Sequence, residues 1–166
     1  MTIIVKTLIF TILVPGSITV GAPYLLLSSR LEIYSFQSGS LRLMGILPLA
    51  FGTVVYLRCA WDFAFAGRGT PAPVDPPRVL VTRGLYGMVR NPIYVGVLLI
   101  LAGEAMLFES VTLLFYAFLL WLVFHLFVVF YEEPTLQEKF GAAYEEYCKA
   151  VPRWIPRRLD AKRNSP

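Results

Sequence analysis

The sequence is poor in the residues on which metal sites and soluble catalytic sites usually depend. It has one histidine, two cysteines and only 16% charged residues in a chain of 166. His125 has no Cys, Asp or second His at ligand spacing, so we expect no metal site, and we expect the imidazole to hydrogen bond between helices. A G-x-G-x-x-G motif after a strand, a Walker A loop, H-E-x-x-H and G-x-S-x-G are all missing. Their absence argues against the common soluble nucleotide-binding and hydrolase sites.

Apolar residues dominate instead. Hydrophobic residues make up 57% of the chain and the mean hydropathy is +0.63. The apolar stretches 3–27, 41–65, 92–107 and 111–131 approach or exceed the ~20 residues that a bilayer-crossing helix needs. The sequence therefore predicts an all-α integral membrane protein with about four transmembrane helices. The last two stretches are separated by a few residues, so we expect them to form a tight helical hairpin.

The basic residues predict the orientation of these helices. Lys and Arg are concentrated between the second and third stretches and after the fourth, and such loops stay on the cytoplasmic side. This pattern places both termini in the cytoplasm. The net charge of +4 reflects this bias and an attraction to anionic lipid headgroups, so we expect membrane lipid as a partner and no nucleic acid.

Composition divides the chain into four segments. Residues 1–65 hold the first two membrane helices, and residues 66–91 form a connector rich in Pro, Gly and Arg. Residues 92–156 hold the helical hairpin and a C-terminal amphipathic helix, which we expect Gly141 to divide in two. Residues 157–166 form a basic tail that we expect to be flexible and solvated.

The segment Arg90-Asn91-Pro92-Ile93-Tyr94-Val95-Gly96 opens the hairpin. Proline is well placed in the first turn of a helix, so Arg90 and Asn91 stand where free N–H groups and the helix dipole favour an anion. Tyr94 offers an aromatic face and a hydroxyl, and Gly96 leaves room for a ligand or a neighbouring helix. The alternative is that Arg90 reaches lipid phosphate, Pro92 only starts the helix and Gly96 only packs.

Glu132 and Glu133 follow the fourth stretch, where we expect the helix to end. Carboxylates there oppose the negative end of the helix dipole, so they require cationic partners such as Arg90, Arg153 or a ligand. Two polar clusters on one membrane face form a candidate active site, because lipid disfavours charge that is not paired, hydrated or functional.

These segments together resemble the isoprenylcysteine carboxyl methyltransferase family, which is similar to the phospholipid N-methyltransferases and has bacterial relatives. The family pattern is an R-H-P-x-Y-x-G opening, a Glu-Glu pair after a helical hairpin, F-G-x-x-Y-x-x-Y and V-P-x-x-x-P. Here it corresponds to residues 90–96, 132–133, 140–147 and 151–156. Asn91 stands where the family has His, and an amide cannot titrate, so we expect it to orient a ligand.

The resemblance implies methyl transfer from S-adenosylmethionine to a lipophilic small molecule or lipidated acceptor, in the bacterial inner membrane. It leaves open whether the acceptor is an isoprenoid-type carboxylate or a lipid amine. The expected catalytic residues are Arg90, Glu133 and Arg153. The expected cofactor-binding residues are Arg90, Asn91, Pro92, Tyr94, Gly96, Glu132, Glu133, Tyr144 and Tyr147.

Two other classes stay open at this point. A membrane reductase using NADPH needs a similar cytoplasm-facing pocket. A small transport or assembly protein without enzymatic activity also accounts for the apolar helices, although it does not explain the two polar clusters.

Overall fold

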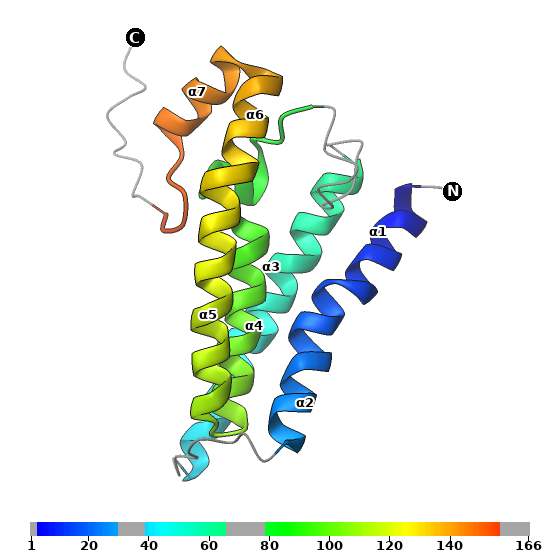
Figure 1. Cartoon of the computed structure of the whole chain (residues 1–166), viewed down its shortest axis with the longest axis vertical. Helices are drawn as coiled ribbons and strands as arrows, with labels where there is room; N and C mark the ends of the chain where they lie inside the picture. Colours follow the sequence, from blue (N-terminus) through cyan, green and yellow to red (C-terminus); the bar gives the residue numbers. More distant parts are fainter. Residues whose placement is uncertain (1–2, 30–38, 66–78, 157–166) are drawn as a thin grey trace.

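The computed structural model describes residues 3–29, 39–65 and 79–156. Every regular element within these ranges is a helix, which confirms the all-α prediction. The long helices run along the long axis of the molecule, and α6 and α7 lie at one end (Figure 1). The basic tail 157–166 and the first part of the predicted connector lie outside the described residues.

The N-terminal helices form one continuous run, which we call the first helical run. It consists of α1 (Ile3–Leu13), a π-helical turn (Ser17–Gly21) and α2 (Ala22–Ser28). Pro15 has no N–H to donate, and the wider π turn just after it lets the helix continue. Proline inside a helix usually kinks or breaks it, but here the change in hydrogen-bond pattern stays inside one helix.

Helices α3 (Ile46–Phe65) and α4 (Pro92–Leu107) pack closely against each other. A 3-10 helix (Gly39–Gly45) precedes α3, and a second one (Gly84–Gly87) lies ahead of α4. Near the end of α3, Arg58 and Asp62 form the i, i+4 ion pair, 3.4 Å apart, that helical spacing favours.

Four glycines allow the close approach of α3 and α4. A Cβ on Gly52 would lie 2.6 Å from the carbonyl oxygen of Gly96, and one on Gly103 would lie 2.6 Å from that of Gly45. These distances are shorter than any ordinary contact, so no larger residue fits without moving a backbone. Small residues at helix crossings are a usual device for packing in membranes.

Helices α4 and α5 (Val111–Phe127) are joined by only three residues. Glu109 adopts a positive φ of 52° in this turn, and the Ser110 hydroxyl caps α5 by accepting from Leu113 N–H at 3.2 Å. The two helices then pack side by side (Figure 1).

The helix of the fourth apolar stretch does not end at the glutamates, contrary to expectation. A π-helical turn (Val128–Glu132) follows α5 and leads into α6 (Glu133–Phe140) without a break. Pro134 lacks an N–H, and the π turn ahead of it accommodates that loss. Glu132 and Glu133 therefore project from the body of a continuous helix.

Gly141 then separates α6 from α7 (Ala142–Ala150), as predicted. Its φ of +53° is in a region that residues with a Cβ rarely adopt. The chain reverses here, and Tyr144, Tyr147 and Val151 become buried together.

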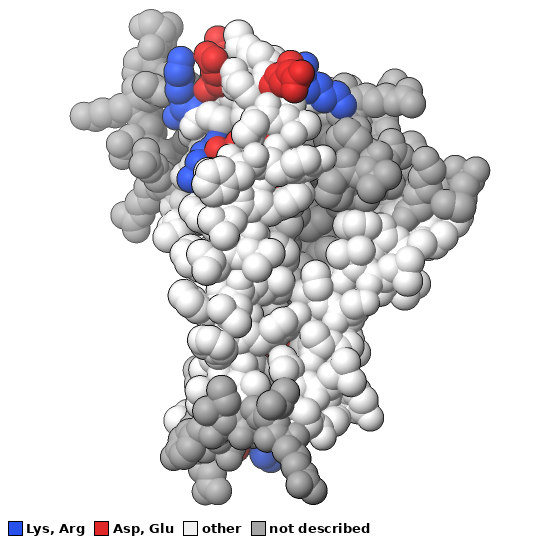
Figure 2. Space-filling model, viewed as in Figure 1, with Lys and Arg blue, Asp and Glu red and all other residues white. Residues whose placement is uncertain are grey.

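Within the described residues, three helices are long and apolar enough to cross a membrane: Thr7–Ser28, Gly39–Asp62 and Val111–Phe140. Helix α4 is apolar but has only 16 residues, so a fourth crossing stays a prediction. In Figure 2 the charged side chains gather at the end where α6 and α7 lie, while the middle of the visible face has almost none. This distribution fits a membrane protein with one polar end.

Candidate functional site

Three segments distant in sequence meet at the polar end of the molecule. They are the start of α4, the junction of the π turn with α6, and residues 151–156 after α7. The backbone N–H of Arg90 donates to the carbonyl of Pro152 at 2.8 Å, and the Asn91 amide donates to the carbonyl of Arg153 at 3.2 Å. The C-terminal segment is thus held against the start of α4, and the two predicted polar clusters do converge.

Glu133 links these segments through charge. Its carboxylate accepts from Arg153 Nε at 2.7 Å and Arg153 Nη2 at 2.9 Å, and it lies 3.1 Å from Arg90 Nη1. The two-point contact with Arg153 has the strong fork geometry that guanidinium and carboxylate groups favour. The hydrogen bond with Glu133 also raises the pKa of Arg153. Glu133 therefore contacts both Arg90 and Arg153, the two arginines that the sequence suggested as its cationic partners.

Glu132 has a different environment. Its Oε2 accepts a hydrogen bond from the Tyr94 hydroxyl at 2.9 Å, and no residue in the described part of the chain forms an ion pair with it. The Tyr94 ring packs against Phe124, with centroids 4.6 Å apart, and faces Trp154 at 6.4 Å. Glu132 is thus a carboxylate beside an aromatic wall, with its negative charge not balanced by a described cation.

Arg90 is held tightly but still has hydrogen-bonding capacity. Its side chain is 13% exposed, and Nη1 also donates to the Cys148 sulfur at 2.8 Å. Its Nε is buried and lacks a hydrogen-bond partner within the described residues. An orphaned donor of this kind is costly unless a ligand or solvent satisfies it.

The two tyrosines of α7 are part of the packing beneath this site. The Tyr147 hydroxyl donates to the carbonyl of Tyr86 at 2.7 Å, and Tyr144 is 4% exposed. Burial raises the pKa of Tyr86, Tyr144 and Tyr147, so all three stay neutral at physiological pH. The Tyr147 hydroxyl is thus used in a hydrogen bond within the protein, and contact of either α7 tyrosine with a ligand stays a prediction.

Two other predicted residues occupy structural positions. Pro92 is fully buried in the first turn of α4. The space beside Gly96 is filled by Gly52, Val55 and Tyr56 of α3. Of the two interpretations of Gly96, the structure favours close packing with a neighbouring helix over room for a ligand.

The sequence did not predict the contact between Trp154 and His125. Trp154 Nε1 donates to His125 Nδ1 at 3.2 Å, which fastens the C-terminal segment to α5. His125 also stacks on Trp121, with centroids 5.7 Å apart. We expected His125 to hydrogen bond between helices, whereas its partner Trp154 lies in the segment that follows α7.

Comparison with known proteins agrees with the sequence motifs. The profile described as phospholipid methyltransferase matches residues 41–143. A protein-S-isoprenylcysteine O-methyltransferase of Schizosaccharomyces pombe is 40% identical over 79 residues, covering 47% of this chain and 33% of the relative. Protein-S-isoprenylcysteine O-methyltransferase B of Arabidopsis thaliana is 36% identical over 78 residues, covering 46% of this chain and 39% of the relative.

A probable protein-S-isoprenylcysteine O-methyltransferase of Oryza sativa subsp. indica is 35% identical over 78 residues, covering 46% of this chain and 40% of the relative. Each match therefore covers at most two fifths of the relative's length. The resemblance to isoprenylcysteine carboxyl methyltransferases that the motifs predicted is confirmed.

Proposed function

Because the chain belongs to the phospholipid methyltransferase family, we propose that it transfers a methyl group from S-adenosylmethionine to a lipophilic acceptor. The reaction takes place at the membrane face where α6 and α7 lie, on the cytoplasmic side. The observation that carries this proposal is the presence of two groups: the Glu132 carboxylate, which lacks a described cation, and the buried Arg90 Nε, which lacks a hydrogen-bond partner within the described residues. The two groups lie at the same end of α4 and α5.

The charges of this site suit S-adenosylmethionine. When bound, this cofactor supplies an electrophilic methyl group on a sulfonium, and it also carries an ammonium and a carboxylate. Glu132 would hold the cationic part, since it is the carboxylate without a described cationic partner. Arg90 would hold the carboxylate through its free Nε, with the N-terminal end of α4 adding a favourable dipole.

Glu133 and Arg153 act as positioning residues. Glu133 is engaged by two guanidinium groups, so it fixes Arg90 and joins the C-terminal segment to α6. The aromatic rings of Tyr94, Phe124 and Trp154 exclude water beside Glu132. Positioning and exclusion of water are the main contributions that such a site can make to a displacement at a methyl group.

The acceptor is a carboxylate carried by a lipophilic group. The matched relatives from S. pombe and A. thaliana are protein-S-isoprenylcysteine O-methyltransferases, and their names specify transfer to oxygen. A carboxyl group with a pKa of about 4 is already ionised at neutral pH, so its oxygen attacks without a strong base. This agrees with Asn91, which cannot titrate, in the place of the family's His.

The rival reductase is a poorer fit to these charges. NADPH carries several phosphate groups and needs several cationic donors, whereas Arg90 offers only its Nε as a donor without a partner in the described part of the chain, and Arg153 is engaged by Glu133. The carboxylate of Glu132 would repel a phosphate. A transport or assembly role gives no reason for an arginine donor without a described partner and an acidic group without a described counter-charge at the same end of the molecule.

The test is methyl transfer from labelled S-adenosylmethionine in lipid nanodiscs. Two acceptors are compared, a prenylated cysteine with a free carboxylate and a phospholipid with an amine headgroup. We expect the label on the carboxylate, a loss of at least tenfold in Glu132→Gln, and little change in Glu146→Gln, an exposed residue of α7. Label on the amine would overturn the acceptor assignment, and no label on either would overturn both acceptor classes.

A further inference from the structure

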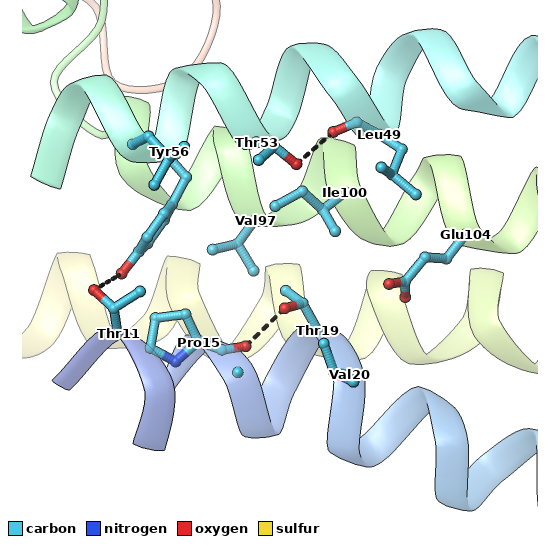
Figure 3. A pocket seen from close by; sticks show the side chains of 12 residues that line it. Thr11, Pro15, Thr19, Val20, Leu49, Thr53, Tyr56, Val97, Ile100 and Glu104 are labelled. Carbon is cyan, nitrogen blue, oxygen red and sulfur yellow. Dashed lines mark hydrogen bonds between the residues drawn. The ribbon is translucent and has the colours of Figure 1, made fainter. Parts of the chain in front are cut away.

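A cavity lies within the apolar part of the molecule, among residues other than those of the site described above. It has a volume of about 340 Å³ and lies between the first helical run, α3 and α4 (Figure 3). Its lining includes Thr11, Gly16, Thr53, Tyr56, Val97 and Glu104. A cavity of this size is at the lower end of the range for small-molecule sites.

The walls of the cavity offer little to a polar ligand. Thr19 donates to the carbonyl of Pro15 at 2.8 Å, and Thr53 donates to that of Leu49 at 2.8 Å. Thr11 and Tyr56 share a hydrogen bond of 2.9 Å. Since these hydroxyls bond within the protein, the walls present mostly carbon to whatever occupies the cavity, which suits an aliphatic chain.

Glu104 is the exception. Its Oε2 is buried and has no hydrogen-bond partner within the described residues. The side chain points into the space between α4 and the first helical run (Figure 3). The nearby Tyr116 hydroxyl donates instead to the carbonyl of Ile18 at 3.1 Å. A buried carboxyl oxygen on an apolar helix that lacks a partner indicates a functional site, because leaving it unsatisfied is costly.

We propose that this cavity binds a single aliphatic chain whose polar end donates a hydrogen bond to Glu104. A long-chain alcohol and a long-chain amine share this chemistry. Two of its walls belong to helices that are long and apolar enough to cross a membrane, which would bring lipid to the cavity. Glu104 stands twelve residues after Pro92 on one helix, about 18 Å along its axis. Glu104 is therefore far along α4 from Arg90, and the cavity lining includes none of the residues that form the site at Glu132 and Arg90.

The test is photolabelling of the protein in phosphatidylcholine nanodiscs. The probe is a dodecanol with a diazirine group, and unlabelled dodecanol, dodecylamine and dodecane compete with it. We expect labelled peptides from the cavity walls and at least tenfold stronger competition by the alcohol or the amine than by dodecane. The better competitor identifies the head group. Equal competition by all three would overturn the role of Glu104.

Matched glycine variants test whether the probe binds in this cavity. Gly16 lines the cavity, and a Cβ built on it has its nearest neighbour, Thr11 O, at 3.5 Å, so Gly16→Leu fits and fills space. Gly21 has a similar helical φ, open surroundings and no place in the lining, so Gly21→Leu is the control.

We expect Gly16→Leu to lower labelling at least tenfold, Gly21→Leu to leave it unchanged, and Glu104→Leu to remove the preference over dodecane. Unchanged labelling in Gly16→Leu would overturn the proposal. Binding of S-adenosylmethionine is expected to match the parent in all three variants, so failure of this site is distinguishable from failure of the proposed methyl transfer.

Discussion

Replacing Glu133 by glutamine should loosen the C-terminal segment from the start of α4. Glutamine is nearly the same size, but its neutral amide keeps only one acceptor oxygen and turns a donor toward two guanidinium groups. Hydrogen bonds to charged groups contribute about 1.5–3 kcal/mol each. Glu133 and Arg153 are 20% and 32% exposed, so solvent reduces the value. We expect a loss of about 2 kcal/mol of docking free energy.

Hydrogen exchange gives a direct measure of this docking. The Arg90 amide donates to the carbonyl of Pro152 at 2.8 Å, and separating the C-terminal segment breaks this bond. A loss of about 2 kcal/mol corresponds to roughly 30-fold faster exchange if local opening limits it. Mass spectrometry of the peptide around Arg90 is the assay.

The control is Glu146→Gln, which removes the same charge from an exposed position on α7. It should leave the exchange rate of Arg90 within about a factor of two of the parent, as expected of a surface change. Equal exchange rates in Glu133→Gln and the parent would refute the conclusion that Glu133 holds the segments together.

Three further changes probe the packing around the site. Gly103→Leu should destabilise the protein by about 1–3 kcal/mol or more in detergent unfolding, since a Cβ there meets Gly45 O at 2.6 Å, whereas Gly21→Leu should cost little. Burial raises the pKa of Tyr147 in the folded protein above its value in the unfolded chain. The contribution of the neutral Tyr147 to the free energy of unfolding is therefore complete below about pH 10 and is lost as pH rises through the folded pKa. Tyr147→Phe should reduce the loss of stability above about pH 10, and identical pH profiles in the variant and the parent would contradict this. Trp154→Phe should speed exchange at Arg90 about fivefold by removing the bond to His125, a loss of about 1 kcal/mol, and no acceleration would show that this bond does not hold the segment.

Some parts of the fold followed directly from the sequence. Pro92 at the start of α4 and Gly141 between two helices act through their own backbone preferences, so local sequence was enough. The pairing of Glu133 with arginine was also predictable, because charge near a membrane border requires an opposite charge.

Other features depend on helix phase and tertiary contacts. The π turn at Val128–Glu132 shifts the phase of the helix, and Glu133 meets two arginines while Glu132 meets Tyr94. From the sequence we expected both glutamates to bind the cofactor and Glu133 alone to be catalytic, with no sign that they have different partners. The bond between Trp154 and His125 joins residues 29 positions apart and left no pattern to detect.

The glycine seam is a different case. Gly45 and Gly52 on one side, and Gly96 and Gly103 on the other, are each seven residues apart, close to two helical turns. This spacing was visible in the sequence and could have predicted that α3 and α4 pack through glycine. Gly96 was instead interpreted as the last residue of the motif at residues 90–96.

The central claim is that Glu132 and Arg90 hold S-adenosylmethionine between them, and titration calorimetry in detergent tests it most directly. The parent, Glu132→Gln and Glu146→Gln are compared at neutral pH, with NADPH as a second ligand. We predict micromolar binding of S-adenosylmethionine by the parent and Glu146→Gln, at least tenfold weaker binding by Glu132→Gln, and no binding of NADPH. Equal affinity in all three proteins, or binding of NADPH and not S-adenosylmethionine by the folded parent, would contradict the account.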